Sequence, residues 1–142
     1  MSENLIASSS IVIDAPPDKV WRALTDPKTI KKYYFGTRVT SDWEPGSPII
    51  WKGVHEGRKY RDHGTILDVR PGELLIHTHF NEKSGREDIP ENYHTLTYTL
   101  DGTGDRTEVT LTQDNNHSYE EVNYSEKNWR TVLEGLKKVV ES

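Results

Sequence analysis

Cysteine is absent from the 142-residue sequence, and its absence excludes several kinds of site. The chain has no disulfides, no thiolate ligands for a metal and no cysteine nucleophile. It also lacks any run of eighteen apolar residues, and its opening, MSENLIASSS, has no basic-then-apolar leader typical of a secretory signal. We therefore expect a cytoplasmic protein that does not insert into membranes.

Positive charge is scarce as well. The sequence has 18 Lys and Arg against 23 Asp and Glu, which gives a net charge of −5. Binding to a phosphate backbone relies on a dense basic face, and the short run Lys28, Lys31 and Lys32 is too small to form one. The composition therefore predicts no nucleic-acid partner.

Aliphatic residues are few, but aromatic residues can build a core. The hydrophobic share is only 32%, yet the chain has four Trp and seven Tyr, whose rings are large apolar faces. The length suits one core, so residues 1–142 are expected to form a single domain.

The first part of the chain changes abruptly from strand to helix. A β-branched run ends the stretch from Ser8 to Ile13 and predicts a strand. Pro16 and Pro17 then end the strand and suit the first turn of a helix. Asp26 and Pro27 repeat the same device, so a second short helix should follow. We assign Trp21, on the first helix, to the core.

The middle of the chain predicts an antiparallel sheet. Strands are expected around residues 49–51, 59–70, 74–81, 94–101 and 107–114, with turn signals and no helix between them. Leu96, Tyr98 and Leu100 alternate with threonines, which indicates one dry and one wet face. A break in alternation at residues 66–69 predicts a bulge, and the polar stretch 82–92 a mobile loop.

One long helix is expected at the end of the chain. Ser118 and Glu121 form a capping box, and an apolar stripe follows at helical spacing: Val122, Trp129, Val132, Leu133, Leu136, Val139 and Val140. The element order predicts an α+β fold in which a curved sheet wraps around this helix and the two short helices close one end.

In this order, the residues resemble the START-like (SRPBCC) superfamily and, within it, homologues of the activator of the heat-shock-protein-90 ATPase. The resemblance runs from Ile11 to Val140 and is carried by 15-APP-17, 20-VW-21, 24-LTDP-27, 45-PG-46, Gly64, Pro71, 74-LL-75, Trp129, Leu133, Leu136 and Lys137. It implies the helix-grip fold and a cavity between the sheet and the last helix that takes lipids, polyketides or flavonoid-like rings. It also implies a stress-response, co-chaperone type of protein partner.

The aromatic residues are therefore the candidates for a ligand site. The residues expected to bind a small hydrophobic or aromatic molecule are Tyr34, Phe35, Trp51, Phe80, Tyr98, Trp129 and Leu133. A filled core would use the same residues. In that case an interaction module of the co-chaperone type is the alternative, and it should show an exposed apolar patch.

Histidines are the only residues that suggest metal or acid–base chemistry. His77 and His79 share one strand face, and His55, His63 and His94 lie on or near other predicted strands, so two strand histidines and a third from a neighbouring strand are candidate zinc ligands. No carboxylate has a matching ligand spacing and no HExxH, GxSxG, Walker or GxGxxG motif occurs, so we predict ordinary strand histidines, no metal, no cofactor and no assigned catalytic residue. An enzyme of the polyketide cyclase type, with a cavity His or Tyr as acid or base, is the third alternative.

Overall fold

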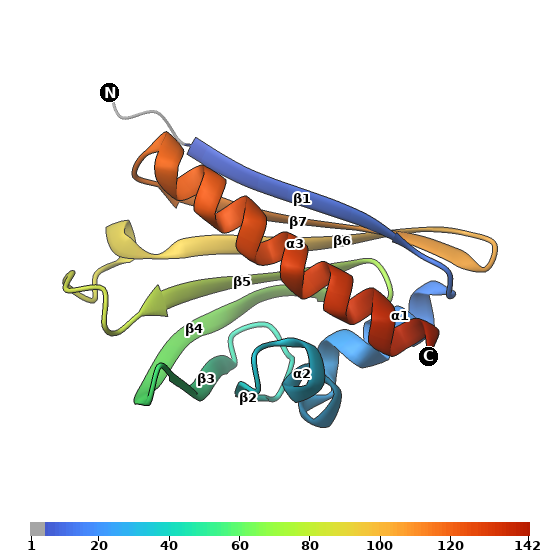
Figure 1. Ribbon diagram of the computed structural model, residues 1–142, viewed down its shortest axis with the longest axis horizontal. Helices are drawn as coiled ribbons and strands as arrows, with labels where there is room; N and C mark the ends of the chain where they lie inside the picture. Colours follow the sequence, from blue (N-terminus) through green and yellow to red (C-terminus); the bar gives the residue numbers. More distant parts are fainter. Residues whose placement is uncertain (1–4) are drawn as a thin grey trace.

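A computed structural model of the protein describes residues 5–142 (Figure 1). The elements are, in order, β1 (Leu5–Ile13), α1 (Pro17–Thr25), α2 (Pro27–Tyr33), β2 (Arg38–Ser41), β3 (Pro48–His55), β4 (Arg58–Arg70), β5 (Leu74–Asn81), the short 3-10 helix η1 (Pro90–Asn92), β6 (His94–Thr103), β7 (Arg106–Asn116) and α3 (Tyr119–Glu141). This order confirms the predicted α+β helix-grip fold. Within residues 5–142 no helix is both long enough and apolar enough to span a bilayer.

The sheet is a single curved layer of seven strands in the order β1-β7-β6-β5-β4-β3-β2. All neighbouring strands are antiparallel. The long helix α3 crosses the concave face of the sheet, and α1 and α2 lie near its C-terminal end (Figure 1). The sheet and α3 therefore face each other, as the helix-grip prediction requires.

The abrupt change from β1 to α1 is a corner in which proline and backbone hydrogen bonds cooperate. The Ala15 amide donates to the Ile13 carbonyl at 2.9 Å, and extended Pro16 caps a helix that begins at Pro17. The predicted second cap is also present, because an Asp26 carboxylate oxygen accepts a hydrogen bond from the Lys28 amide at 3.2 Å. The chain thus leaves the sheet and forms two helices without a loop between them.

A bulge bends β4 where the sequence predicts one. The β4–β5 register shifts between Ile66 and Asp68. The Ile66 amide and carbonyl bond instead to Ser47 and Gly46, in the turn before β3, at 2.9 and 2.7 Å. Bulges increase local twist, so this one helps to curl β3 and β4 toward α3. The β6–β7 hairpin is longer than predicted, because its strands run on to Thr103 and Arg106.

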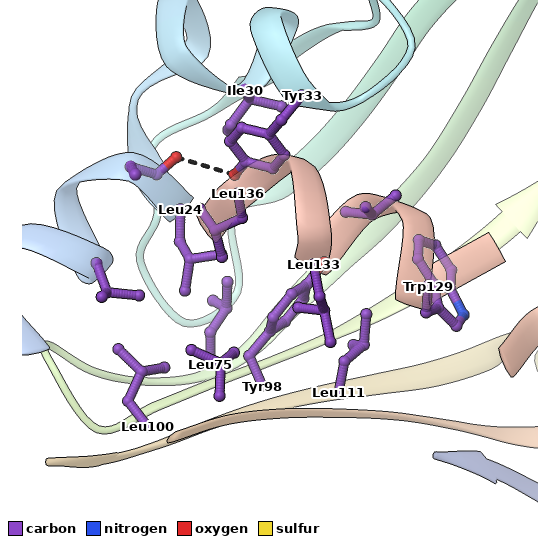
Figure 2. Packing of buried hydrophobic residues seen from close by; sticks show 14 of the residues in the cluster. Leu24, Ile30, Tyr33, Leu75, Tyr98, Leu100, Leu111, Trp129, Leu133 and Leu136 are labelled. Carbon is purple, nitrogen blue, oxygen red and sulfur yellow. Dashed lines mark hydrogen bonds between the residues drawn. The ribbon is translucent and has the colours of Figure 1, made fainter. Parts of the chain in front are cut away.

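The apolar stripe of α3 packs on the dry face of the sheet, as predicted. Leu133 is 1% exposed and Leu136 is fully buried. Figure 2 shows Leu133 above Tyr98 and Leu111, with Trp129 one turn away toward the N-terminus of α3. In the same figure the Tyr33 hydroxyl donates to the Ala23 carbonyl at 2.9 Å and joins α2 to α1. The prediction that Trp21 belongs to the core needs correction, because Trp21 is only half-buried and packs at the margin of the core.

Helix α3 also covers the free edge of β1. Glu126 and Glu141 carboxylates accept hydrogen bonds from the Ser8 and Asp14 amides at 2.9 and 2.8 Å, and Lys137 Nζ donates to the Val12 carbonyl at 2.9 Å. The bonds from the Asp14 amide and from Lys137 lower the pKa of Glu141. Exposed strand edges invite pairing with other chains, so these side chains protect the edge as well as orient the helix.

Candidate functional site

A small cavity lies between α2, the concave face of the sheet and the segment around β2. Its volume is about 30 Å³, which is room for little more than a water molecule. It is lined by Leu24, Ile30, Tyr33, Tyr34, Val39, Trp43, Ile49, Trp51, Leu75, His77 and Tyr98. The sequence predicts a cavity between the sheet and the C-terminal helix, but no residue of α3 lines this one, and aromatic side chains fill most of its space.

The structure brings together three of the residues predicted to bind a ligand. Tyr34, Trp51 and Tyr98 line the cavity. Trp129 lies behind Tyr34, with ring centroids 6.0 Å apart, and Leu133 packs in the core beside Tyr98 (Figure 2). Trp129 and Leu133 thus support the cavity wall and do not line it.

Two predicted site residues lie elsewhere. Phe35 is 58% exposed, because it follows α2 with a φ of 52°. Phe80 is buried, but it pairs with His63 across the β4–β5 ladder and stacks on Tyr93 at 5.1 Å. Alternate residues of a strand point to opposite faces, so Phe80 lies on the convex face while His77 and His79 lie on the concave face. The placement of Phe80 beside the cavity was therefore wrong.

His77 is a cavity residue that aromatic patterning alone does not identify. It is 3% exposed, its ring lies 5.1 Å from that of Trp51, and Nδ1 lies 2.9 Å from the Thr78 carbonyl. A carbonyl only accepts, so Nδ1 carries the proton and Nε2 keeps a lone pair. Burial lowers the pKa of His77 to about 4, and burial raises the pKa of Tyr98. At neutral pH both groups are uncharged hydrogen-bonding groups in an aromatic wall.

A carboxylate–imidazole pair adjoins the cavity. Asp62 Oδ2 lies 3.1 Å from His79 Nε2, and the two side chains are 15% and 16% exposed. The His79 ring meets the Trp51 ring edge-on at 4.8 Å. His94 stands directly across from His79 on β6. The concave face therefore carries three histidines beside its aromatic residues.

These histidines do not assemble into a metal site. Among residues 5–142 no group of three or more His, Cys, Asp or Glu side chains is placed to hold a metal ion. His63 lies on the convex face with Phe80, and His55 is 81% exposed at the β3–β4 hairpin.

A buried polar network holds Trp129 in place. The Trp129 indole N–H donates to Gln113 Oε1 at 2.9 Å, and Gln113 Nε2 donates to Asn116 Oδ1 at 2.9 Å and to Ser125 Oγ at 3.1 Å. Such networks rigidify when every member is satisfied. The N-terminal half of α3 is thus fixed over β7, behind Tyr34.

Comparison with known proteins identifies the family. The family described as "Activator of Hsp90 ATPase homolog 1-like protein" matches residues 14–141. The chain belongs to this family. Its START-like helix-grip fold is the one expected for the Hsp90-activator homologues, and it is compatible with a ligand-binding module in general. No curated protein matches the sequence.

Three solved structures resemble this member of the family. A protein of Cytophaga hutchinsonii, known from its solution structure, is 50% identical, covers 99% of this chain and 97% of its own, and has a TM-score of 0.86. The solution structure of the Aha1 dimer from Colwellia psychrerythraea is 21% identical, covers 96% of both chains, and has a TM-score of 0.76. A crystal structure from Mesorhizobium loti is 20% identical, covers 96% and 97%, and has a TM-score of 0.78. The last two establish likeness of fold alone.

In this member of the family, the stretch 82–92, which the sequence predicts to be a mobile loop, forms hydrogen bonds with His63 on the convex face of the sheet. His63 Nδ1 lies 2.7 Å from Glu82, and its Nε2 lies 3.0 Å from Asp88 and 2.9 Å from the Tyr93 hydroxyl. Tyr93 also donates to Asp88, and burial together with this bond raises the pKa of Tyr93 to about 12. The stretch 82–92 is therefore tied to the sheet over Phe80.

A larger open cleft lies elsewhere on the surface and shares no lining residue with the small cavity. It has a volume of about 850 Å³ and is lined by Pro17, Asp18, Trp21, Arg22, Pro71, Gly72, Glu73, Leu100, Asp101 and Gly102. Its Asp18–Arg22 pair is 3.8 Å apart and mostly exposed. The cleft is wide and its charges are solvated, whereas the small cavity combines aromatic walls with buried polar groups, as ligand sites do.

The buried imidazole of His77 makes stability depend on pH. The pKa of His77 is about 4 in the folded protein and near 6.5 in the unfolded chain, so only the unfolded state binds this proton between those values. Its contribution is complete above pH 6.5 and is lost toward pH 4, by about 3 kcal/mol in total. Urea unfolding at a series of pH values should show this slope. His77→Gln should flatten it, and an equal slope in His77→Gln would contradict the assignment.

Proposed function

We propose that the protein binds a small aromatic molecule without covalent chemistry, at the cavity lined by Tyr34, Trp51, His77 and Tyr98. The observation that carries this proposal is a set of polar atoms inside an aromatic cavity. In the described part of the chain, every fully buried side-chain nitrogen or oxygen has a hydrogen-bond partner. His77 Nε2 and the Tyr98 hydroxyl have none among residues 5–142, so both atoms reach open space, and the space that these residues line is the cavity.

These polar atoms suit a ring that carries an oxygen or nitrogen atom. His77 Nε2 accepts a hydrogen bond, and the Tyr98 hydroxyl both donates and accepts. The Trp51 ring in the cavity wall supplies a stacking face. Ligand pockets generally combine an apolar wall with a few polar groups that orient the ligand, and this cavity has that composition.

The cavity must widen before a ring can enter. Its volume of about 30 Å³ is well below the roughly 150 Å³ of an apolar cavity known to take benzene. Tyr34 is the half-buried cover, and the backbone on either side of β2 has positive φ at Phe35 (52°), Gly36 (71°) and Trp43 (57°). Edge strand β2 pairs only with β3 among the described strands. Movement of Tyr34 and this segment is the route that we propose for the ligand.

Truncation of Tyr34 tests the proposal. If opening the cover opposes binding, Tyr34→Ala should bind 4-nitroanisole about tenfold more tightly than the parent, because the site is then open in advance. The measurement is quenching of tryptophan fluorescence together with a thermal shift. Trp129 touches Tyr34, so Trp129→Phe should remove part of the fluorescence response.

Phe35→Ala is the matched control, because Phe35 is the neighbouring aromatic residue but points to solvent. Its affinity for 4-nitroanisole should equal that of the parent. The proposal is wrong if neither the parent nor Tyr34→Ala binds the probe, or if Phe35→Ala changes the affinity as much as Tyr34→Ala does.

A co-chaperone type of protein interaction is the second candidate. The nearly filled cavity favours it, as does the 58% exposure of Phe35, because an interaction module needs an exposed apolar residue rather than a pocket. The test is stimulation of the ATPase of the organism's own heat-shock protein 90. Stimulation that Phe35→Ala abolishes, without any small ligand, would favour this candidate.

A further inference from the structure

We infer that Asp62 and His79 form a proton-accepting pair that selects aromatic ligands bearing an acidic hydroxyl group, such as phenols and enols, and holds them as anions. This inference rests on the proposed ligand site and specifies the chemistry that the site recognises. It gives a role to Asp62 and His79, two polar side chains of the concave face that do not line the aromatic cavity.

The geometry fixes the proton on one nitrogen of His79. His79 Nε2 lies 3.1 Å from Asp62 Oδ2, so Nε2 carries the hydrogen and donates it to the carboxylate. Nδ1 then holds a lone pair, and it has no hydrogen-bond partner among residues 5–142. Because no fully buried polar atom in that range lacks a partner, Nδ1 is also accessible. A carboxylate, an oriented imidazole and an open Nδ1 are the parts of a general base.

The pair is next to the proposed ligand site. Trp51 contacts His77 inside the cavity and His79 outside it, with centroid distances of 5.1 and 4.8 Å. Burial, and then the charges of Tyr98 and Asp62, raise the pKa of Tyr34. A ring that packs against Trp51 lies beside both His77 and His79, so its hydroxyl group can face His79.

The proton transfer is balanced within the site. The ligand O–H bond breaks, its proton moves to Nδ1, and the ligand keeps the electron pair as an oxyanion beside the new imidazolium. Asp62 on β4 stabilises the imidazolium, as a carboxylate does in other oriented histidines. The other titratable groups around His79 are His77 on β5, His94 on β6 with Glu121 of α3 beyond it, and Tyr34 after α2. Of these, His77 is neutral at pH 7.

4-Nitrophenol reports the proton directly, because its anion is yellow and its neutral form is nearly colourless. At neutral pH, where part of the probe is still uncharged in solution, adding the parent protein should produce a further rise in the yellow band. His79→Gln and Asp62→Asn should lose this rise and bind 4-nitrophenol about tenfold more weakly, as expected for a lost charge-assisted hydrogen bond. Both variants should bind 4-nitroanisole, which has no acidic proton, with the parent's affinity.

His94→Gln is the matched control, since His94 is a hydrogen-bonded histidine directly opposite His79 on the same face. It should keep the rise in the yellow band. Binding of both probes by the parent without this rise, or a rise that survives in His79→Gln, would overturn this inference and leave the proposed function standing. Failure of the parent to bind either probe would overturn both.

The ring nitrogens of His79 give a second readout that needs no variant to fold. In ¹⁵N spectra of the parent at neutral pH, Nε2 should be protonated and Nδ1 bare, and 4-nitrophenol should shift Nδ1 to the protonated value while 4-nitroanisole does not. An Nδ1 that is unchanged by saturating 4-nitrophenol would contradict the transfer.

Discussion

Replacing Gly64 by alanine should destabilise the protein by about 3 kcal/mol or more. A Cβ at this position would lie 1.9 Å from the Thr78 carbonyl oxygen and 2.6 Å from its carbon. Both atoms belong to the backbone of β5, so no side chain can move aside, and β4 and β5 would have to separate where they hold His79 and the curve of the sheet. Urea unfolding monitored by circular dichroism measures the change.

Gly72→Ala separates this steric effect from the loss of glycine itself. Gly72 has a φ of 79° in a turn, and a Cβ there would meet no atom within 4 Å. Its replacement should destabilise by about 1 kcal/mol, the strain of a left-handed alanine. A Gly64→Ala variant no less stable than Gly72→Ala would show that the two strands do not pack as closely as described.

Truncating Leu133 to alanine should destabilise the protein by about 2 to 5 kcal/mol. Leu133 is 1% exposed and packs above Tyr98 and Leu111 in the centre of the core (Figure 2). The variant loses the buried methyl groups and leaves a void under α3 that the rigid sheet fills only in part. The result is read from the midpoint of denaturant unfolding.

Lys138→Ala controls for changes in helix propensity, because Lys138 lies on the solvent side of α3. It should change stability by no more than about 0.5 kcal/mol. If Leu133→Ala and Lys138→Ala had equal unfolding midpoints, Leu133 would not be a core residue, and the described packing of α3 on the sheet would be wrong.

The fold was predictable because its signals are local. The prolines at 16 and 17, the cap at Asp26 and the capping residue Ser118 each set a helix boundary through contacts within a few residues. Alternation along β6 and β7 then identified the dry face, which is the face that α3 covers. Periodicity reports which way side chains point within one element, and that was sufficient for the architecture.

The candidate site was only partly predictable because it depends on contacts between distant elements. Phe80 is buried on the convex face by Tyr93, which lies thirteen residues later in the sequence, and the sequence around Phe80 does not indicate this contact. The Asp62–His79 pair depends on the register of β4 against β5, which the bulge at residues 66–68 alters. Trp21 packs one part of its ring on the core and presents the rest to the open cleft, a division that hydrophobic patterning does not reveal.

The location of a bound ring tests the ligand site most directly. Nuclear Overhauser effects should be measured between 4-nitroanisole and the side-chain protons of the protein, with Trp21 and Pro17 of the open cleft serving as the internal comparison. We expect contacts from the probe to Trp51, Tyr98 and His77, and none to Trp21 or Pro17. Contacts to Trp21 and Pro17 without any to Trp51 or Tyr98 would contradict a ligand site in the small cavity lined by Trp51, His77 and Tyr98.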